Sequence, residues 1–195
     1  MWCAIRWLLA LFGHMQRGIR KVMVKRKMDK SFLVDVTIDT SVENDVPGDI
    51  ASVIEKVTRL TWRKIDMGKG SAELSLFLTN DAQVRRLNKD YRNKDKPTNV
   101  LSFSALDDTA GLLDDVPNLL GDVVLGFETI RDEAARHGKT FADHVCHLSV
   151  HGVLHLAGFD HETDASANEM QELEIDVLAA AGIANPYGTW VDASE

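Results

Sequence analysis

The sequence predicts a single α+β domain, built from a small, mixed, four-stranded sheet that is covered by about five helices. Apolar residues alternate along several short segments, as in half-buried strands, and recur every three or four residues along longer segments, as in amphipathic helices. The chain has 195 residues, of which 45% are hydrophobic and 27% are charged, and its sequence shows no internal repeat and no linker. This length and composition suit one globular domain.

The expected elements can be placed in order along the chain. They are a strand at 32–38, a helix at 49–64, a strand at 74–78, a helix at 80–91, strands at 100–103 and 122–127, and helices at about 129–137, 140–157 and 165–181. Thr79 or Asn80 can cap the second helix, Thr140 caps the fourth, and Gly182 ends the last one. Residues 104–120 are rich in Asp, Leu and Gly and are expected to form a long exposed loop.

The distribution of charge divides the chain in two. The net charge is −8, yet residues 1–28 carry seven of the 22 Lys and Arg side chains and none of the 30 acidic ones. This basic segment is interpreted either as an extension caused by a start codon assigned too early, which Met23 and Met28 favour, or as an organellar transit peptide. Residues 29–195 then form the folded domain. It is expected in the cytoplasm, or in an organelle if the segment is a transit peptide.

Composition excludes two classes of protein. No apolar run reaches the roughly 18 to 20 residues that a helix needs to cross a bilayer, so no membrane segment is expected. The two cysteines, Cys3 and Cys146, are too few for a disulfide framework and lack the spacing of a zinc ribbon or a redox pair. These features indicate a protein of a reducing compartment.

Residues 151–161, with the sequence HGVLHLAGFDH, carry the strongest chemical signal. His151 and His155 are four positions apart, so on a helix they lie about 40° apart around the axis and roughly 6 Å along it, and both can reach one ion. His161 is out of reach on an unbroken helix, but Gly158 can adopt the left-handed conformation that turns the chain back. Three imidazoles with a fourth position open to water are the ligand set of catalytic zinc. The motif therefore predicts one Zn²⁺ per chain on a zincin-like metal helix.

Other residues of this helix help to define the chemistry. His147 lies one turn further back, too far to share the ion, and is expected to contact a ligand or face the substrate, whereas His144 is expected at the surface. The spacing matches the metzincin helix H-E-x-x-H-x-x-G-x-x-H, but Gly152 stands where those proteases have their general base. A protease of that class is disfavoured, and metal-assisted hydrolysis of another electrophile stays open.

A second cluster points to a phosphate. Residues 81–96 contain six basic and three acidic side chains in an otherwise acidic domain. A solvated helix face explains most of these bases, but Arg92 lies at the end of the expected helix, where its guanidinium can hold a phosphate by two hydrogen bonds. Asp122 either orients a ligand histidine through its second nitrogen or is an ordinary carboxylate at a strand end.

Four motifs recur together in one known family. They are HGVLHLAGFDH at 151–161, YRNKDKPTNVLSF at 91–103, LGDVVL at 120–125, and a terminal helix that ends in GIANPY. Over most of residues 32–187 the sequence resembles the YbeY endoribonucleases. The resemblance implies that His151, His155 and His161 are the zinc ligands and that Arg92 acts in RNA cleavage. Phe159 stands where the family commonly has Tyr, and the segment before Met28 has no counterpart in the family.

The resemblance also implies a function. It is that of a zinc-dependent, single-strand-specific endoribonuclease that matures the 3′ end of small-subunit (16S) rRNA and takes part in ribosome quality control. The expected partners are single-stranded RNA, including rRNA, and the small ribosomal subunit with its proteins. Because the domain is acidic, we expect local contact with RNA through residues 85–96.

Alternatives stay open at this point. Attack by hydroxide in line leaves a 5′ phosphate, whereas attack by the RNA's own 2′-OH leaves a cyclic phosphate. One rival function is a metallohydrolase that acts on a peptide or a small ester. The other is a non-catalytic ribosome assembly factor with a structural metal, which a fourth protein ligand such as His147 or Glu162 would support.

Overall fold

The structure, a computed structural model, describes residues 19–20, 32–65, 71–105 and 118–188. The strands are β1 (Ile19–Arg20), β2 (Phe32–Asp39), β3 (Ala72–Thr79), β4 (Val100–Ser104) and β5 (Asn118–Gly126). The helices are α2 (Ile50–Ile65), α3 (Asp81–Arg92), α4 (Phe127–Arg136), α5 (Phe141–Leu156) and α6 (Asp164–Ala181). The α+β class is confirmed, with the four expected strands and the five expected helices all present. The rest of the basic N-terminal segment, including Cys3, lies outside the described residues.

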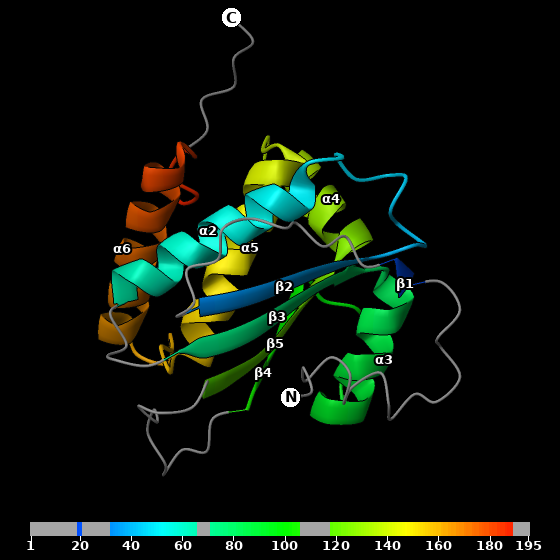
Figure 1. The fold of residues 1–195 in the computed structure, drawn as a ribbon, viewed down its shortest axis with the longest axis horizontal. Coiled ribbons are helices and arrows are strands. Elements are labelled where there is room, and N and C mark those ends of the chain that lie inside the picture. The colour runs from blue at the N-terminus through cyan, green and yellow to red at the C-terminus, as the bar shows by residue number, and fades with distance from the viewer. Residues whose placement is uncertain (1–18, 21–31, 66–70, 106–117, 189–195) are drawn as a thin grey trace, which may run out of the picture.

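The strands form one mixed sheet in the order β1-β2-β3-β5-β4 (Figure 1). The three inner strands β2, β3 and β5 run parallel to one another, and the strands at the two edges are antiparallel to their neighbours. The two residues of β1 pair with Asp39 and Ile38 of β2. A short piece of the basic segment, which the sequence sets apart from the domain, is therefore the fifth strand of the sheet.

β5 begins at Asn118, inside the segment that the sequence predicts as a loop. The sequence pattern misses this start because the pairing of β3 with β5 is irregular. The register shifts between Glu73 and Leu74, so that Leu74 pairs with Gly121. Gly121 has φ of 133°, a conformation that other residues rarely adopt. The extra residue interrupts the alternation of apolar side chains, so the start of the strand is hidden in the sequence.

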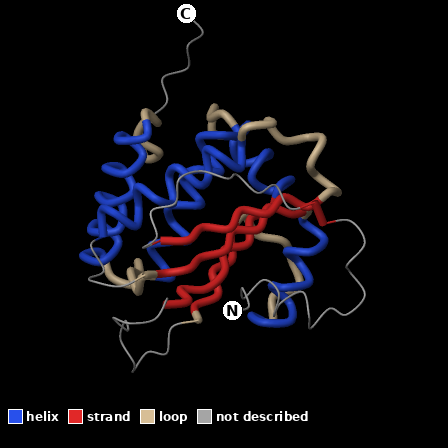
Figure 2. The backbone as a smooth tube through the Cα atoms, in the orientation of Figure 1, coloured by secondary structure: helices blue, strands red, loops and turns tan. Residues whose placement is uncertain are grey.

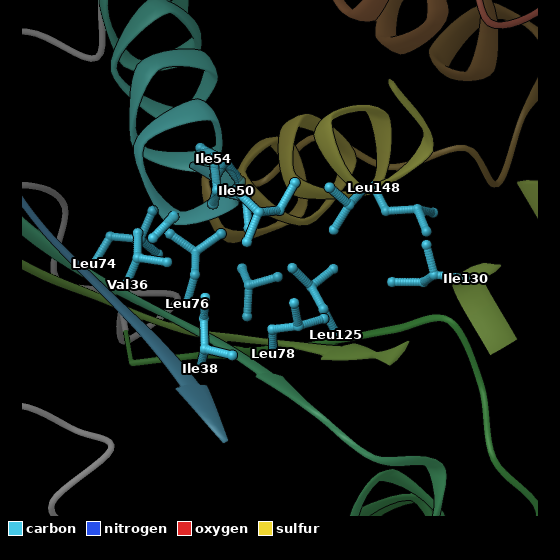
Figure 3. Packing of buried hydrophobic residues seen from close by; sticks show 14 of the residues in the cluster. Val36, Ile38, Ile50, Ile54, Leu74, Leu76, Leu78, Leu125, Ile130 and Leu148 are labelled. Carbon is cyan, nitrogen blue, oxygen red and sulfur yellow. The ribbon is translucent and has the colours of Figure 1, made fainter. Parts of the chain in front are cut away.

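Helices α2, α4 and α5 cover one face of the sheet, and α3 covers the other (Figures 1 and 2). The larger core lies on the first face, where Ile54 of α2, Ile130 of α4 and Leu148 of α5 meet Leu76 and Leu125 of the sheet (Figure 3). Each such aliphatic side chain contributes about 1.5 to 3 kcal/mol when it is fully buried. This core fixes α5, the helix of the histidine motif, against the sheet.

A second apolar cluster attaches α6 to α2 and α5. Met170 and Leu178 of α6 pack with Val57 of α2 and with Val150 and Leu154 of α5. One side of α5 thus faces the sheet, and another faces α6. In the described part of the chain, no helix combines the length and the apolar character that a membrane span requires.

Candidate metal centre

α5 presents two of the three histidines on successive turns. Thr140 begins the helix, because its hydroxyl accepts a hydrogen bond from the backbone N–H of Asp143. His151 and His155 follow on one side of the helix, with ring centroids 4.5 Å apart and Nε2 atoms 3.0 Å apart. The two imidazoles therefore meet at their Nε2 atoms.

The chain turns back directly after α5 and brings in the third histidine. Gly158 has φ of 90°, in the left-handed region. The N–H of Phe159 donates to the carbonyl of Leu154, and that of Gly158 to the carbonyl of His155, which is the Schellman pattern. Beyond this turn the ring of His161 lies 5.0 Å from that of His155 and 5.5 Å from the other imidazole. Gly158 thus lies at the point where the chain turns back.

Nitrogen atoms of the three histidines converge on one point. One ligand atom from each of His151, His155 and His161 lies within 4.8 Å of the other two. Among the residues that the structure describes, neither His147 nor Glu162 belongs to this group. Zinc takes four ligands in proteins, so a site with three protein ligands leaves one position for water or substrate. That is the donor set of a catalytic site.

Hydrogen bonds to the other ring nitrogens determine where the protons lie. His155 Nδ1 is 3.0 Å from the carbonyl oxygen of Phe159, which can only accept, so Nδ1 carries the proton. His151 Nδ1 donates in the same way to Oε1 of Glu174, at 2.8 Å. The Nε2 lone pairs of both imidazoles are then directed at the same place. Two nitrogens about 2.1 Å from a tetrahedral zinc lie roughly 3.4 Å apart, so these residues fit a zinc ion.

The surroundings also keep His155 neutral. Burial lowers the pKa of His155, and the neighbouring His151 and His161 lower it further. Neutral imidazole is the form that binds metal, so the lowered pKa favours metal binding near neutral pH. His155 contacts the backbone carbonyl of Phe159. Because this contact is with the backbone, it does not depend on the side chain at position 159.

Glu174 of α6 is the carboxylate of the site, and it is not among the residues predicted from the sequence. Its side chain is fully buried and accepts hydrogen bonds from His151, His147 and Tyr187. Burial by itself would raise the pKa of Glu174, but these three hydrogen bonds outweigh it and lower the pKa to about 2. The signal was present in the helical pattern, because Glu174 lies between Met170 and Leu178 on the buried face of α6. A carboxylate on an apolar face needs a partner inside the protein.

The two histidines at the start of α5 form separate contacts. His147 Nε2 lies 3.1 Å from Oε2 of Glu174, so His147 touches the residue that holds His151. His144 was expected at the surface, but it is buried, and its Nε2 lies 2.9 Å from a carboxylate oxygen of Glu133 of α4. Burial lowers the pKa of His144. The expectation for His144 was wrong because α4 covers the first turns of α5.

Gly152 allows α5 to lie directly on the sheet. A Cβ atom at this position would be 2.7 Å from Cγ1 of Val123 and 3.2 Å from the hydroxyl oxygen of Ser102. That hydroxyl donates to the carbonyl of Gly152, at 3.2 Å. The position that holds the general base in metzincins here faces β4 and β5 and has no room for a side chain.

Asp122 lies on the other face of the sheet. Along β5, Val123 and Leu125 belong to the core beneath α5, whereas Val124 packs beneath α3, so Asp122 faces the α3 side by alternation. Burial raises the pKa of Asp122 to about 6, and a hydrogen bond with Ser75 opposes the shift. The partners of the ligand histidines are Glu174 and the Phe159 carbonyl, so the structure does not bring Asp122 to either of them.

Arg92 is the exposed last residue of α3. The end of this helix is attached to β4, because the ring of Tyr91 packs edge-on against Phe103 at 5.1 Å. Among the described residues, Arg92 forms no hydrogen bond or ion pair, and none of their contacts joins it to the three histidines. In contrast, Arg85 and Lys89 are both paired with Asp95, at 2.7 and 2.9 Å. No residue in the described ranges therefore holds the guanidinium of Arg92.

Comparisons of the sequence with known sequences agree on one family. The sequence model described as "Endoribonuclease YbeY" matches residues 35–182. The Endoribonuclease YbeY of Paramagnetospirillum magneticum is 48% identical over 160 residues, which are 78% of this chain and 98% of the relative. That of Nitrobacter winogradskyi is 50% identical over 137 residues, or 70% and 72% of the two chains. The solution structure of TM1509 from Thermotoga maritima matches with a TM-score of 0.45 and 18% identity, over 80% of this chain and 99% of that one. On the match of its sequence over residues 35–182, the chain belongs to the YbeY family of endoribonucleases.

Proposed function

We propose that this chain is a zinc-dependent, single-strand-specific endoribonuclease that matures the 3′ end of 16S rRNA in the cytoplasm and takes part in ribosome quality control. The convergence of three imidazole nitrogens within 4.8 Å, with no fourth protein ligand among the described residues, is the observation that carries the proposal. The curated relatives are named endoribonucleases, which supports RNA as the substrate. The proposed partners are single-stranded rRNA and the small ribosomal subunit with its proteins.

The residues of the chain have distinct proposed roles in cleavage. His151, His155 and His161 hold one zinc ion per chain, which would supply a Lewis acid next to the scissile phosphate and lower the pKa of water. Arg92 binds the phosphate by two charge-assisted hydrogen bonds and offsets the negative charge that develops at phosphorus. Because its guanidinium is held by no described residue, it can reorient when RNA binds.

The basic end of α3 is the proposed contact with the RNA backbone. Arg92, Lys94 and Lys96 are exposed, and the loop that carries them is held in place by Asn88, whose side-chain amide donates to the carbonyl of Lys96 at 2.7 Å. Each phosphate that such a cation neutralises releases counterions, so binding should weaken as salt rises, by roughly 0.7 logarithmic units per phosphate for each tenfold increase.

Cleavage by an Arg92→Ala variant tests the proposal. Arginine stays protonated and binds no metal, so the variant should keep one zinc per chain and near-normal stability. If Arg92 stabilises the transition state, cleavage of unstructured RNA should slow by roughly 10² to 10³. Arg85→Ala is the comparison on the same helix, because Arg85 is paired with Asp95, and it should slow cleavage far less than Arg92→Ala.

Further arms of the experiment separate the alternatives. The phosphate at the new ends reports the route, because a cyclic phosphate shows attack by the 2′-OH and a 5′ phosphate shows attack by water. Neither form should cut a peptide, since position 152 carries no base. Wild-type cleavage by Arg92→Ala would contradict the role of Arg92. A zinc-loaded wild type that cleaves no RNA would support the assembly-factor alternative instead.

A further inference from the structure

The chain returns to the metal centre after its last helix. Gly182 ends α6, and the segment that follows places Tyr187 beside α5, with its ring 5.4 Å from that of His147 in an edge-on contact. The ammonium of Lys139 donates to the carbonyl of Pro186 at 2.7 Å and fastens this segment to the start of α5. The hydroxyl of Tyr187 donates to Oε2 of Glu174. The end of the GIANPY motif thus contacts the carboxylate of the site.

Glu174 accepts hydrogen bonds from three donors on both of its oxygens. His151 Nδ1 donates to Oε1 at 2.8 Å, whereas His147 Nε2, at 3.1 Å, and the Tyr187 hydroxyl both donate to Oε2. The carboxylate is fully buried, so the three donors replace the water that a carboxylate would otherwise bind. Its orientation, and with it the position of Oε1, therefore depends on the donors at Oε2.

We propose that Tyr187 is a positioning residue of the metal centre, which holds Glu174 so that Glu174 presents the Nε2 lone pair of His151 to zinc. The inference rests on the proposed zinc centre. Carboxylates that bond the far nitrogen of a ligand histidine set its tautomer and its orientation, and removing them weakens metal binding by 10- to 100-fold as an order of magnitude. Tyr187 acts one step further out, through the second oxygen of that carboxylate. Both burial and Glu174 raise the pKa of Tyr187, which keeps its hydroxyl protonated as a donor.

Removal of the hydroxyl alone should weaken the metal site. In Tyr187→Phe the ring can still pack against His147, but Oε2 keeps only the donor from His147 and the buried carboxylate is one hydrogen bond short. Glu174 is then free to rotate toward His147 and to lengthen its bond to His151. We expect the Kd for zinc to rise about tenfold, the lower end of the range for partners of metal ligands.

The test measures zinc affinity of the full chain by competition with a chelator of known affinity, without RNA. The variants are Tyr187→Phe, Glu174→Gln and the two combined, and Tyr91→Phe is the matched control, because Tyr91 is another half-exposed tyrosine but lies on α3. Tyr91→Phe should bind zinc like the wild type, and Glu174→Gln should bind more weakly than Tyr187→Phe. If Tyr187 acts through Glu174, the double variant should be no weaker than Glu174→Gln.

The outcomes decide between positioning and plain packing. Urea unfolding of the metal-free proteins shows whether Tyr187→Phe affects the fold in the absence of zinc. Wild-type zinc affinity in Tyr187→Phe, whatever its stability, would overturn the inference. The inference would also be overturned if the double variant bound zinc more weakly than Glu174→Gln by the full effect of Tyr187→Phe, because Tyr187 would then act independently of Glu174. If Glu174→Gln does not fold, Glu174→Asp takes its place in the cycle, and Tyr187→Phe alone still decides.

A wild type that binds no zinc would overturn both this inference and the proposed function. Loss of RNA cleavage with intact zinc binding would contradict only the proposed function.

Discussion

At the scale of single residues, the site depends on which ring nitrogen of each histidine is free. Glu174 and the Phe159 carbonyl occupy Nδ1 of His151 and of His155, and this leaves both Nε2 atoms for the metal. His147 uses its Nε2 to donate to Glu174 and does not belong to the group of nitrogens that could hold the metal. The three ligands and His147 should therefore respond differently to substitution, although all four histidines lie within residues 147–161.

The first prediction at this scale concerns metal stoichiometry. Replacing His151, His155 or His161 by Ala should each remove most of the bound zinc, because two imidazoles are too few to hold it tightly. His147→Ala should keep one zinc per chain, since His147 touches Glu174 and not the ion. Metal analysis of the purified variants checks this. An empty His147→Ala protein together with a loaded His161→Ala protein would show that the ligand set is wrong.

The second prediction concerns Asp122 and pH. Burial raises its pKa from the ordinary 3.8 to about 6, so the folded protein binds this proton more tightly than the unfolded chain. The stabilisation is therefore present at low pH and is lost as the pH rises from about 4 to about 6, by up to about 3 kcal/mol. Asp122→Asn cannot ionise, so relative to the wild type it should be more stable at about pH 8 and nearly equal at about pH 4.

Urea unfolding of both metal-free proteins at the two pH values measures this difference. Comparison with the wild type at each pH cancels the titration of the histidines, which both proteins share. An equal difference at both pH values would mean that Asp122 has an ordinary pKa, and that its burial is offset by partners beyond Ser75.

The residues of the site differ in how far the sequence could predict them. His151, His155 and His161 lie within eleven positions, and helix geometry with one glycine turn is enough to bring them together. Glu174 comes from another helix, so its contact with His151 depends on how α6 packs on α5, which local patterns do not give. For Asp122 the type of element was predictable, but the face of the sheet that it occupies is shown only by the packing of its neighbours.

At the scale of elements, the end of α5 determines whether the third ligand arrives. Gly158 has φ of 90° and nothing lies within 4 Å of the place where a Cβ would be, so the requirement for glycine is conformational and not a matter of space. The same turn carries the Phe159 carbonyl to His155. At Gly152 the requirement for glycine is steric, because a Cβ there would lie 2.7 Å from Cγ1 of Val123 in β5. Two glycines of one motif thus serve the turn and the helix-to-sheet contact.

Gly158→Ala tests the turn. An alanine forced into the left-handed region costs about 1 to 2 kcal/mol, and relief of that strain would move His161 away from the other two ligands. We expect a loss of stability of that size, measured by urea unfolding, together with weaker zinc binding. Gly48→Ala is the control, since Gly48 also has open space around its Cα and lacks a positive φ, and it should be nearly neutral. Equal behaviour of the two variants would contradict the role of the Gly158 turn.

The boundaries of the elements show what local patterns can and cannot predict. α2 and α6 begin and end within about one residue of the expected limits, because caps and periodicity mark a helix end locally. β5 was predicted four residues short, because its bulge at Gly121 belongs to the pairing with β3, an interaction between distant parts of the chain. The order of the strands depends on such distant pairing too.

At the scale of the whole molecule, the proposed metal joins parts of the chain that only the native fold brings together. Two ligands lie on α5, the third follows the turn toward α6, and the carboxylate that supports His151 lies on α6. Met170 and Leu178 already attach α6 to α5 by apolar contact. Zinc bound at the three histidines would add a polar link between the end of one helix and the segment that leads into the next.

Zinc should therefore stabilise the native state and not the unfolded chain. A ligand that binds only the folded form stabilises it by RT ln(1 + [L]/Kd), about 2.7 kcal/mol when free zinc is at 100 times its Kd. We expect the Tm of the metal-free protein to rise when zinc is added, and the rise to disappear in His161→Ala. His147→Ala should keep the rise, since His147 is not a ligand. Magnesium should have little effect, because it prefers oxygen ligands to imidazoles. A Tm that does not respond to zinc in the wild type, or that responds equally in His161→Ala, would show that the three histidines do not join these parts of the chain through a metal.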